Sequence, residues 1–305
     1  MINQLISPFT KGIIFAVIGA VMFSSKAIFI KLSYIENVHF MALLLLRGLF
    51  SIPIFLGIAI FEGRKTDRYR LKKMDIAMML LLGFLGYYLS SVLDFYGLQF
   101  IPASLERVIL YVYPTIVICF AALFFKRRVT LFQIVSLVLT YVGLVFVLGF
   151  QPINSSNLFI YKGVCFVFLS TVSYALFVLF SGEIIPRVGP VRFTALVMIF
   201  SYTFIFCHYF ISFGFLFPHF SYKVIILGLC LGVICTVIPT LFLSQAIFLV
   251  GSSNTALAGA IGPISTVILA YFFLGENIDG IQSFGIALVL MGVGVLNSFG
   301  KKSVN

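Results

Sequence analysis

Charged residues are scarce in this sequence. They make up 10% of its 305 residues, against 62% hydrophobic residues, and the mean hydropathy is +1.18. One water-soluble core cannot hide so much apolar surface, so the composition excludes a soluble globular protein and indicates one that uses lipid as its solvent. The formal net charge of +11 does not indicate nucleic-acid binding, because most basic residues lie in short gaps between apolar runs.

Enzyme motifs are absent as well. The sequence has no HExxH, no GxSxG, no P-loop and no paired acidic motif with metal-ligand spacing. The five cysteines lie inside apolar runs without CxxC spacing, which favours packing residues over disulfides or metal ligands. We therefore expect no enzymatic activity, no cofactor and no metal site.

Apolar runs of membrane-spanning length fill most of the chain. A bilayer core about 30 Å thick requires about 20 helical residues. The first run is too long for the apolar part of a signal peptide and no small-residue cleavage site follows it, so we expect it to be a membrane helix. Cutting the chain at charges, prolines and polar clusters predicts an all-α membrane protein with ten transmembrane helices, near 12–33, 38–61, 74–97, 103–125, 129–149, 161–183, 191–217, 223–250, 253–274 and 279–299.

Basic residues are divided unevenly between the two sides that ten spans define. If the N-terminus is cytoplasmic, the outside receives only Lys162 and Lys223. The positive-inside rule therefore predicts cytoplasmic N- and C-termini, which we place in a bacterial inner (plasma) membrane. The inside receives fourteen basic residues: Lys11, Arg64, Lys65, Arg68, Arg70, Lys72, Lys73, Lys126, Arg127, Arg128, Arg187, Arg192, Lys301 and Lys302.

The chain resembles itself at an offset of 149 residues. This divides it into residues 1–150 and 151–305, each with five helices, and an odd number inverts the second copy in the membrane. Such 5+5 inverted repeats occur in many secondary transporters, which bind substrate near the midplane between the halves. Chance similarity of apolar residues is the alternative. The matched pairs are Ser104 with Ser253, Pro114 with Pro263, Ala121 with Ala270, Phe124 with Phe273, Gln133 with Gln282, Leu139 with Leu288 and Gly143 with Gly292.

The matched prolines, Pro114 and Pro263, each remove one backbone hydrogen bond from a predicted helix and permit a kink. We predict that they act as equivalent hinges or gates. Two prolines tolerated independently are the alternative.

The second half carries a further pattern. It contains Pro263, the string "LGEN" at 274–277, Gln282 and a glycine-rich last helix. Together with the five-plus-five helices, these features resemble the EamA-type members of the drug/metabolite transporter superfamily. The resemblance implies a ten-helix transporter of small metabolites with a central cavity between the halves. The first half departs from it, with "FFKRRVT" at 124–130 and "FSSKAIF" at 23–29.

Five charged residues lie inside predicted helices, and all belong to the first half. Each costs roughly 2.5–3.5 kcal/mol at the bilayer centre, which makes intramembrane charge the main functional clue. Lys26 lies about 21 Å along the first helix, near the midplane, whereas Lys31 is expected to snorkel to the interface. The five are Lys26, Arg47, Asp94, Glu106 and Arg107.

Two roles are open for this cluster. In a structural role, Arg47 pairs with Asp94 and Lys26 with Glu106, which pins the first four helices together. In a functional role, Lys26 meets a substrate carboxylate or phosphate, while Asp94 or Glu106 neutralises it in the empty site and can also carry a proton. Glu106 and Arg107 point about 100° apart, and we expect Arg107 to reach the outer headgroups.

Neutral residues complete the predicted site. Tyr111 and Tyr174 offer aromatic walls with a polar tip, and Gln245 is large and polar in an otherwise apolar helix. Interhelical packing is the alternative role for each of them.

We therefore predict a secondary transporter that moves a small organic metabolite by alternating access. Amino-acid-like or other anionic or zwitterionic solutes are favoured, export is the expected direction, and a proton is the default coupling ion. An exporter of drugs or lipophilic cations is the alternative substrate class. A channel or scaffold is one alternative of another kind, although neither requires the inverted repeat. A membrane enzyme is the other, although its motifs are absent.

Overall fold

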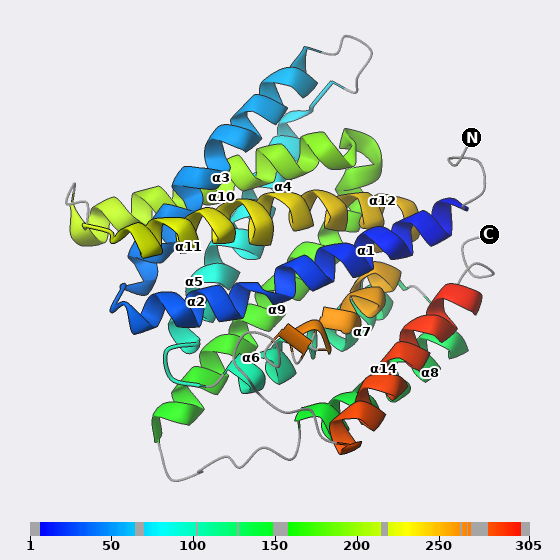
Figure 1. The fold of residues 1–305 in the computed structure, drawn as a ribbon. Coiled ribbons are helices and arrows are strands. Elements are labelled where there is room, and N and C mark those ends of the chain that lie inside the picture. Colours follow the sequence, from blue (N-terminus) through cyan, green and yellow to red (C-terminus); the bar gives the residue numbers. More distant parts are fainter. Residues whose placement is uncertain are drawn as a thin grey trace, which may run out of the picture.

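The computed structural model describes residues 7–64, 70–101, 103–126, 128–148, 158–214, 219–262, 264–266, 268–269 and 280–299. Within these ranges the chain is helical, with no β-strand, and its helices form one bundle (Figure 1). The all-α prediction is confirmed. The first residue of α1 and the last of α14 lie at the same end of the bundle.

Helices of the first half follow one another with short connections. In chain order they are α1 (Pro8–Ser24), α2 (Lys26–Ile35), α3 (Phe40–Gly63), α4 (Lys73–Gly83), the π-helix η2 (Phe84–Leu89), α5 (Ser90–Gly97), α6 (Ala103–Leu110), α7 (Tyr113–Phe125) and α8 (Leu131–Leu148).

The second half contains the longest segments. Its helices are α9 (Leu158–Val188), α10 (Pro190–Phe213), α11 (Tyr222–Gly232), the π-helix η3 (Val233–Val237), α12 (Ile238–Ala258), the 3₁₀-helix η4 (Gly259–Ile261) and α14 (Gly280–Phe299).

Several segments are long and apolar enough to cross a membrane. Six qualify clearly among the described residues, and two shorter apolar helices, Tyr113–Phe125 and Leu131–Gly143, accompany them. The expected ninth helix, 253–274, lies partly outside the described residues. The six are Pro8–Ile35, Phe40–Gly63, Lys73–Gly97, Phe159–Val188, Pro190–Phe213 and Tyr222–Ala258.

The eighth predicted helix, 223–250, continues to Ala258 with a sharp break at Gly251. Gly251 has φ 79° and ψ 166°, a conformation that glycine adopts without the Cβ clash other residues suffer. The sequence predicts a helix end at residue 250. The structure has a kink at Gly251, and helical backbone resumes directly after it.

Interruptions recur inside the spanning segments. The π-helices η2 and η3 begin at Phe84 and Val233, which are 149 residues apart. The backbone also leaves the α-helix at Tyr111–Val112, just before Pro114, and tightens to a 3₁₀-helix at Gly259–Ile261. Breaks in membrane helices free backbone groups that must be satisfied inside the protein or by a water-filled cavity.

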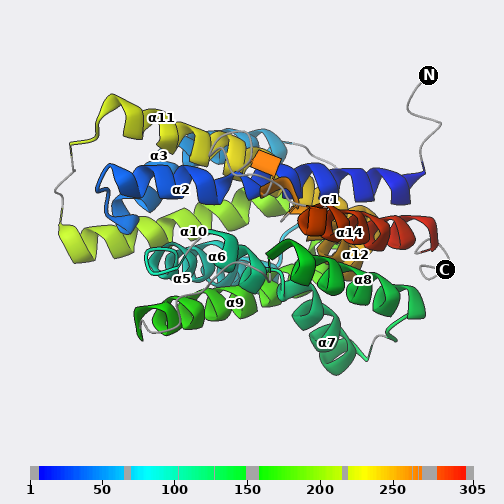
Figure 2. The same ribbon diagram turned by 60° about the horizontal axis from the view of Figure 1, so that its bottom comes forward.

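Glycines bring the helices of the two halves close together. A Cβ on Gly83 would lie 2.8 Å from the Val197 carbonyl oxygen of α10, and one on Gly232 would lie 3.0 Å from the Arg47 carbonyl oxygen of α3. Pairs of helices from different halves pack side by side, namely α1 with α12, α3 with α10, α5 with α9, and α8 with α14 (Figures 1 and 2). Both halves therefore share one interface.

The outer surface is apolar. Ile211, Met74 and Leu123 are 85%, 73% and 70% exposed, and many other large hydrophobic side chains are also exposed. A surface of this kind requires lipid around it, because such patches would aggregate in water. The described part of the chain is thus an integral membrane protein.

Candidate functional site

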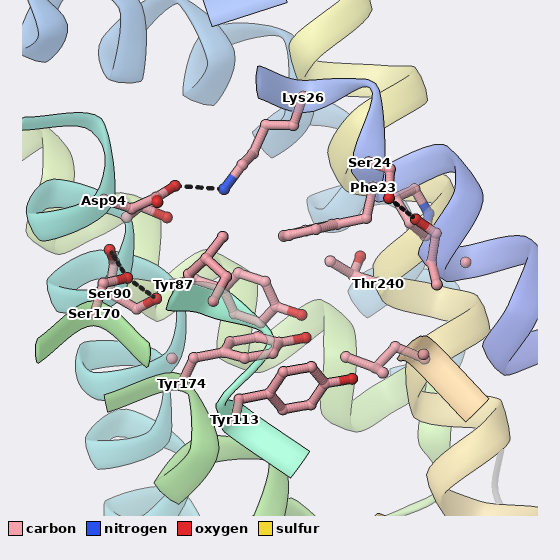
Figure 3. A pocket seen from close by; sticks show the side chains of 18 of the residues that line it. Phe23, Ser24, Lys26, Tyr87, Ser90, Asp94, Tyr113, Ser170, Tyr174 and Thr240 are labelled. Carbon is pink, nitrogen blue, oxygen red and sulfur yellow. Dashed lines mark hydrogen bonds and ion pairs between the residues drawn. The ribbon is translucent and has the colours of Figure 1, made fainter. Parts of the chain in front are cut away.

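A cavity of about 90 Å³ lies inside the bundle where the two halves meet (Figure 3). Its walls come from α1, α2, η2, α5, the α6–α7 region, α9, α12 and η4. A water needs roughly 10–15 Å³, so this volume is large enough for several waters or for part of a small solute. Its position between the halves matches that of substrate sites in transporters with repeated halves.

Lys26 stands at the cavity wall because the first spanning helix breaks directly before it. Ser25 separates α1 from α2, and the hydroxyls of Ser24 and Ser25 donate to the carbonyls of Ala20 and Met22. This turn directs Lys26 Nζ to Asp94 Oδ2 at 2.5 Å (Figure 3). The two side chains are 6% and 2% exposed, so the ion pair is buried.

The observed pairing differs from the structural pairing expected from the sequence. Lys26 pairs with Asp94 and not with Glu106. Arg47 Nη2 donates to Ser91 Oγ at 3.0 Å, and the guanidinium lies 5.3 Å from the ring centre of Phe95. Ser91 and Asp94 are three residues apart on α5 and so share a face, which gives each basic group its own partner. Arg47 is buried but lies outside the cavity wall.

Glu106 and Arg107 occupy neighbouring positions on α6 with different surroundings. Arg107 Nε lies 3.1 Å from Glu106 Oε2, and the residues are 3% and 0% exposed. Arg107 lines the cavity, whereas Glu106 lies behind the wall. The expectation that Arg107 reaches the outer headgroups is therefore wrong, because tertiary packing buries α6 against α9.

Two tyrosines of the first half donate hydrogen bonds to the backbone at the end of α12 and in η4. Tyr111 Oη donates to the Gly259 carbonyl at 2.7 Å, and Tyr113 Oη donates to the Ala256 carbonyl at 2.9 Å. The Gly259 carbonyl also accepts the backbone N–H of Gly262 in the 3₁₀-helix η4. Pro263, four residues after Gly259, has no N–H to offer it, and Tyr111 is a second donor to this carbonyl.

Aromatic side chains form much of the remaining wall. The Tyr113 and Tyr174 rings are 5.6 Å apart at their centres, and Tyr174 stacks on Phe23 at 6.4 Å. Figure 3 shows Tyr87, Tyr113 and Tyr174 gathered on one side of the cavity. Such walls suit a solute with both apolar and polar parts.

Some wall residues escaped the sequence reasoning. Ser170 Oγ donates to the Ser90 carbonyl at 2.8 Å and joins α9 to α5 at the wall. Thr255 also lines the cavity. A small hydroxyl residue in an apolar helix carries no signal that separates a cavity position from a packing position.

The other predicted residues are placed as follows. Gln245 lies half-buried on α12 and is not in the cavity wall. Pro114 is the second residue of α7, which begins directly after the break at Tyr111–Val112. Pro263, the second predicted hinge, lies outside the described residues. The structure thus brings Lys26, Asp94, Tyr111 and Tyr174 together at the cavity, with Glu106 directly behind the wall and Arg47 and Gln245 away from it.

A second, larger cavity has a volume of about 520 Å³. It lies among α7, the start of α8, the end of α9 and α12, with Arg128 on its wall. Gln133 Nε2 donates to Asn254 Oδ1 at 3.4 Å across it. Asn254 lines this cavity, and its neighbour along the chain, Thr255, lines the first.

Comparison with known proteins agrees with this architecture. The sequence profile of the EamA-like transporter family matches twice, at residues 10–149 and 161–298. The chain is 30% identical to the uncharacterized transporter YcbK of Bacillus subtilis over 90% of this chain and 88% of that protein. It is 26% identical to an uncharacterized transporter of Synechocystis over 85% of this chain and 80% of the relative.

A solved crystal structure shares the fold. The two chains superpose with a TM-score of 0.76 over 96% of this chain and 99% of the other, at 14% sequence identity. Similarity to transporters over nearly the whole length supports a membrane transporter of a small solute. On the strength of both matched halves, the chain belongs to the EamA-like transporter family.

Proposed function

We propose that this protein is a secondary transporter that exports a small anionic or zwitterionic metabolite, such as an amino-acid-like solute, by alternating access. The buried Lys26–Asp94 ion pair on the wall of a cavity between the halves carries the proposal. A solute carboxylate would take Asp94's place on Lys26, since a buried ammonium needs an anionic partner to stay charged.

The proposed architecture is ten helices in two inverted halves, 1–150 and 151–305. The two separate family matches support it. So do the π-helices 149 residues apart and the breaks at Tyr111–Val112 and Gly259–Ile261, which lie at equivalent positions under the same offset. Equivalent breaks on both sides of one cavity are suited to opening either side in turn. We assign this hinge role to Pro114 and Pro263.

We propose that three contacts close the cavity at the end near α2. Lys26 binds Asp94, Tyr34 Oη donates to the Phe95 carbonyl at 2.7 Å, and Lys31 Nζ donates to the Leu98 and Ile101 carbonyls at 2.8 and 2.9 Å. Lys31 therefore does more than snorkel, because it caps the end of α5. All three contacts join α2 to the end of the third span.

The opposite end is hollowed by the second cavity. In the proposed orientation, the end with the basic loops faces the cytoplasm. A conformation that is closed near α2 and open at that end would admit a solute from the cytoplasm, which favours export. The distribution of basic loops supports cytoplasmic N- and C-termini. The exposed Arg187 side chain approaches Asp75 at 3.8 Å at the inner end by this assignment, and Lys223 binds Glu36 at 2.5 Å at the outer end. Bacterial relatives favour an inner-membrane location.

We assign the following roles to the predicted residues that line the cavity. Lys26 meets the anionic group, Asp94 releases it, and Tyr111 and Tyr174 shape the space for the solute's body. Export of lipophilic cations is the second candidate, favoured by Asp94 and the aromatic wall formed by Tyr87, Tyr113 and Tyr174.

Transport by the purified protein in proteoliposomes tests the proposal. Vesicles loaded with a panel of amino acids, organic acids, phosphorylated metabolites and lipophilic cations are assayed for efflux with wild type, Lys26→Met and the matched control Lys223→Met. We expect efflux of anionic or zwitterionic solutes that falls at least tenfold in Lys26→Met alone. A preference for lipophilic cations alone would refute the proposed substrate class.

A further inference from the structure

We infer that the second, larger cavity is a separate binding site for the carboxylate or phosphate group of a solute, with Arg128 as its cationic contact. Binding of an anion there does not depend on the Lys26–Asp94 pair. Only the use of this cavity as the first binding site of an exported solute rests on the proposed function. A phospholipid headgroup offers the same anionic chemistry as a dissolved phosphate, and experiment distinguishes the two.

The charge on the wall of this cavity is positive. Among the described residues that line it, Arg128 is the one charged side chain and no carboxylate is present. Arg128 makes no ion pair with any carboxylate in the described part of the chain. The first cavity differs, because Asp94 neutralises Lys26 there. A hollow with a cation and no acid on its wall concentrates anions.

The backbone on either side of Arg128 is fixed. Helix α7 ends at Lys126, whose left-handed conformation (φ 51°, ψ 28°) lets its N–H donate to the Ala121 carbonyl. The Thr130 N–H donates to Gln133 Oε1 at 3.1 Å, and the Gln133 N–H donates to Thr130 Oγ1 at 3.3 Å, which is a capping box at the start of α8. These contacts lie two residues before and two residues after Arg128, so they hold it at the cavity wall.

The same turn is a place where the two halves of the sequence differ. Under the offset of 149 residues, Arg127 and Arg128 stand opposite Glu276 and Asn277. The positive-inside rule accounts for basic residues in this connection. It does not account for the position of Arg128 on the wall of a cavity, which a binding role explains.

A buried hydroxyl group without a partner lines the same cavity. Ser252 is 0% exposed, and its Oγ has no hydrogen-bond partner among the described residues. The buried Ser24 and Ser51 each donate to the carbonyl four residues earlier in their helices. Ser252 makes no such bond, and the helix is broken at Gly251 directly before it. An anionic oxygen in the cavity would supply the acceptor that this hydroxyl lacks.

The size and the remaining walls of the cavity suit a small solute. Its volume of about 520 Å³ falls within the roughly 300–1,000 Å³ of small-molecule sites. The Gln133–Asn254 contact on its wall is long at 3.4 Å, so the Gln133 amide can turn to a bound oxygen at little cost. Apolar side chains there would contact the body of the solute, among them Ile118, Ile247 and Val250.

A cysteine on the wall measures the attraction of anions without any transport. Ser253→Cys places a thiol at a half-buried wall position. The full chain in phosphatidylcholine bilayers is labelled with sulfonatoethyl methanethiosulfonate, which is anionic, and with its cationic trimethylammonioethyl analogue. Labelling of the natural cysteines, measured on the chain without Ser253→Cys, is subtracted. The result is the ratio of the anionic to the cationic labelling rate.

We expect this ratio to fall by roughly tenfold when Arg128→Gln is added, because the cavity then loses its positive charge. Arg128→Lys keeps the charge and should preserve the ratio. The matched control is Arg64→Gln, since Arg64 is an exposed arginine of a predicted inner loop and is not on the cavity wall. Circular dichroism checks that each variant is folded. An equal ratio with and without Arg128→Gln would overturn the inference.

Protection from labelling identifies the source of the anion. Inorganic phosphate or acetate should slow the labelling of Ser253→Cys in phosphatidylcholine bilayers, and Arg128→Gln should abolish this protection. Protection by phosphatidylglycerol alone would assign the site to a lipid headgroup and overturn its use by a dissolved solute. The absence of protection by phosphate, acetate and phosphatidylglycerol would overturn the anion site itself.

Efflux kinetics test the role of the site in transport. For a solute that the wild type exports, Arg128→Gln should raise KM by roughly tenfold and leave the maximal rate nearly unchanged, as expected when a binding contact on the entry path is lost. Arg64→Gln should change neither value. An unchanged KM in Arg128→Gln would overturn the entry role. If the labelling reveals the site but no solute of the panel is transported, that result counts against the proposed transport function alone.

Discussion

Lys26 and Asp94 are joined at 2.5 Å from Nζ to Oδ2, across the gap between α2 and α5, at the wall of the cavity that both halves of the chain build. Breaking such a buried pair from one side leaves an unpaired charge, which typically costs about 3–5 kcal/mol. The pair therefore ties α2 to α5, and under the proposed function it is also the contact that a solute must break.

Lys26→Met should lower the apparent melting temperature and reduce transport at least tenfold, because Asp94 keeps a buried charge without its partner and the solute loses its cationic contact. Thermal unfolding in detergent and proteoliposome efflux measure the two effects. Lys26→Met with full transport and unchanged affinity would show that Lys26 is not a solute contact.

The double variant Lys26→Met with Asp94→Asn separates the structural from the functional contribution. Removing both charges removes the unpaired one, so most of the lost stability should return. Transport should stay low, because the cationic contact is still missing. If transport returned together with stability, the ion pair would serve the fold alone.

Gly262→Ala should destabilise the protein by about 1–3 kcal/mol through overpacking. A Cβ at this position collides with Tyr111 Oη and lies 2.7 Å from Ser24 Oγ. Adding Tyr111→Phe to this variant removes the colliding hydroxyl and should recover part of the loss. The control is Gly57→Ala, because nothing lies within 4 Å of that Cβ. An equal effect at Gly57 and Gly262 would refute the close approach.

Gln245→Leu should leave transport within about twofold of wild type, because Gln245 is not in the cavity wall. Thr240 stands five residues earlier on the same helix and lies in the cavity wall. Thr240→Val should therefore reduce transport more strongly, through loss of a hydroxyl near the solute. Solute efflux by both variants provides the comparison. A larger loss in Gln245→Leu would place the site elsewhere on α12.

Membrane orientation is tested by labelling in intact cells. The Lys223 and Arg187 side chains are 62% and 55% exposed. With cytoplasmic termini, Lys223→Cys should react with an impermeant thiol reagent from outside and Arg187→Cys only after lysis, against the background of the natural cysteines. The reverse pattern would invert the proposed topology.

Much of the fold was predictable because the bilayer imposes it. An apolar run in lipid must satisfy its backbone hydrogen-bonding groups within the segment, and an α-helix does so. The helical class and the approximate positions of the helices therefore follow from the distribution of apolar residues along the sequence. The breaks were partly predictable too, because Pro114 and Gly251 act on their own backbone. The π-helices η2 and η3 were not predicted, since the residues in them are ordinary helix-compatible side chains.

The site was predictable only as a list of unusual residues. A charged side chain inside a membrane-spanning segment costs free energy whichever helix carries it. Lys26, Asp94 and Glu106 could therefore be selected from the sequence alone. Their partners could not, because the rotation of each helix about its axis is set by packing. Gln245 illustrates the limit, since its polarity alone does not place it at the cavity wall.

The sequence by itself determined that this chain lies in a membrane, where its helices run and which charges lipid would not tolerate, because those properties depend on local composition. Only the tertiary structure decided that Lys26 binds Asp94, that Arg107 faces the cavity and that Glu106 lies behind its wall. Those relations join residues up to 68 positions apart along the chain, and they depend on how close-packed helices present their faces to one another.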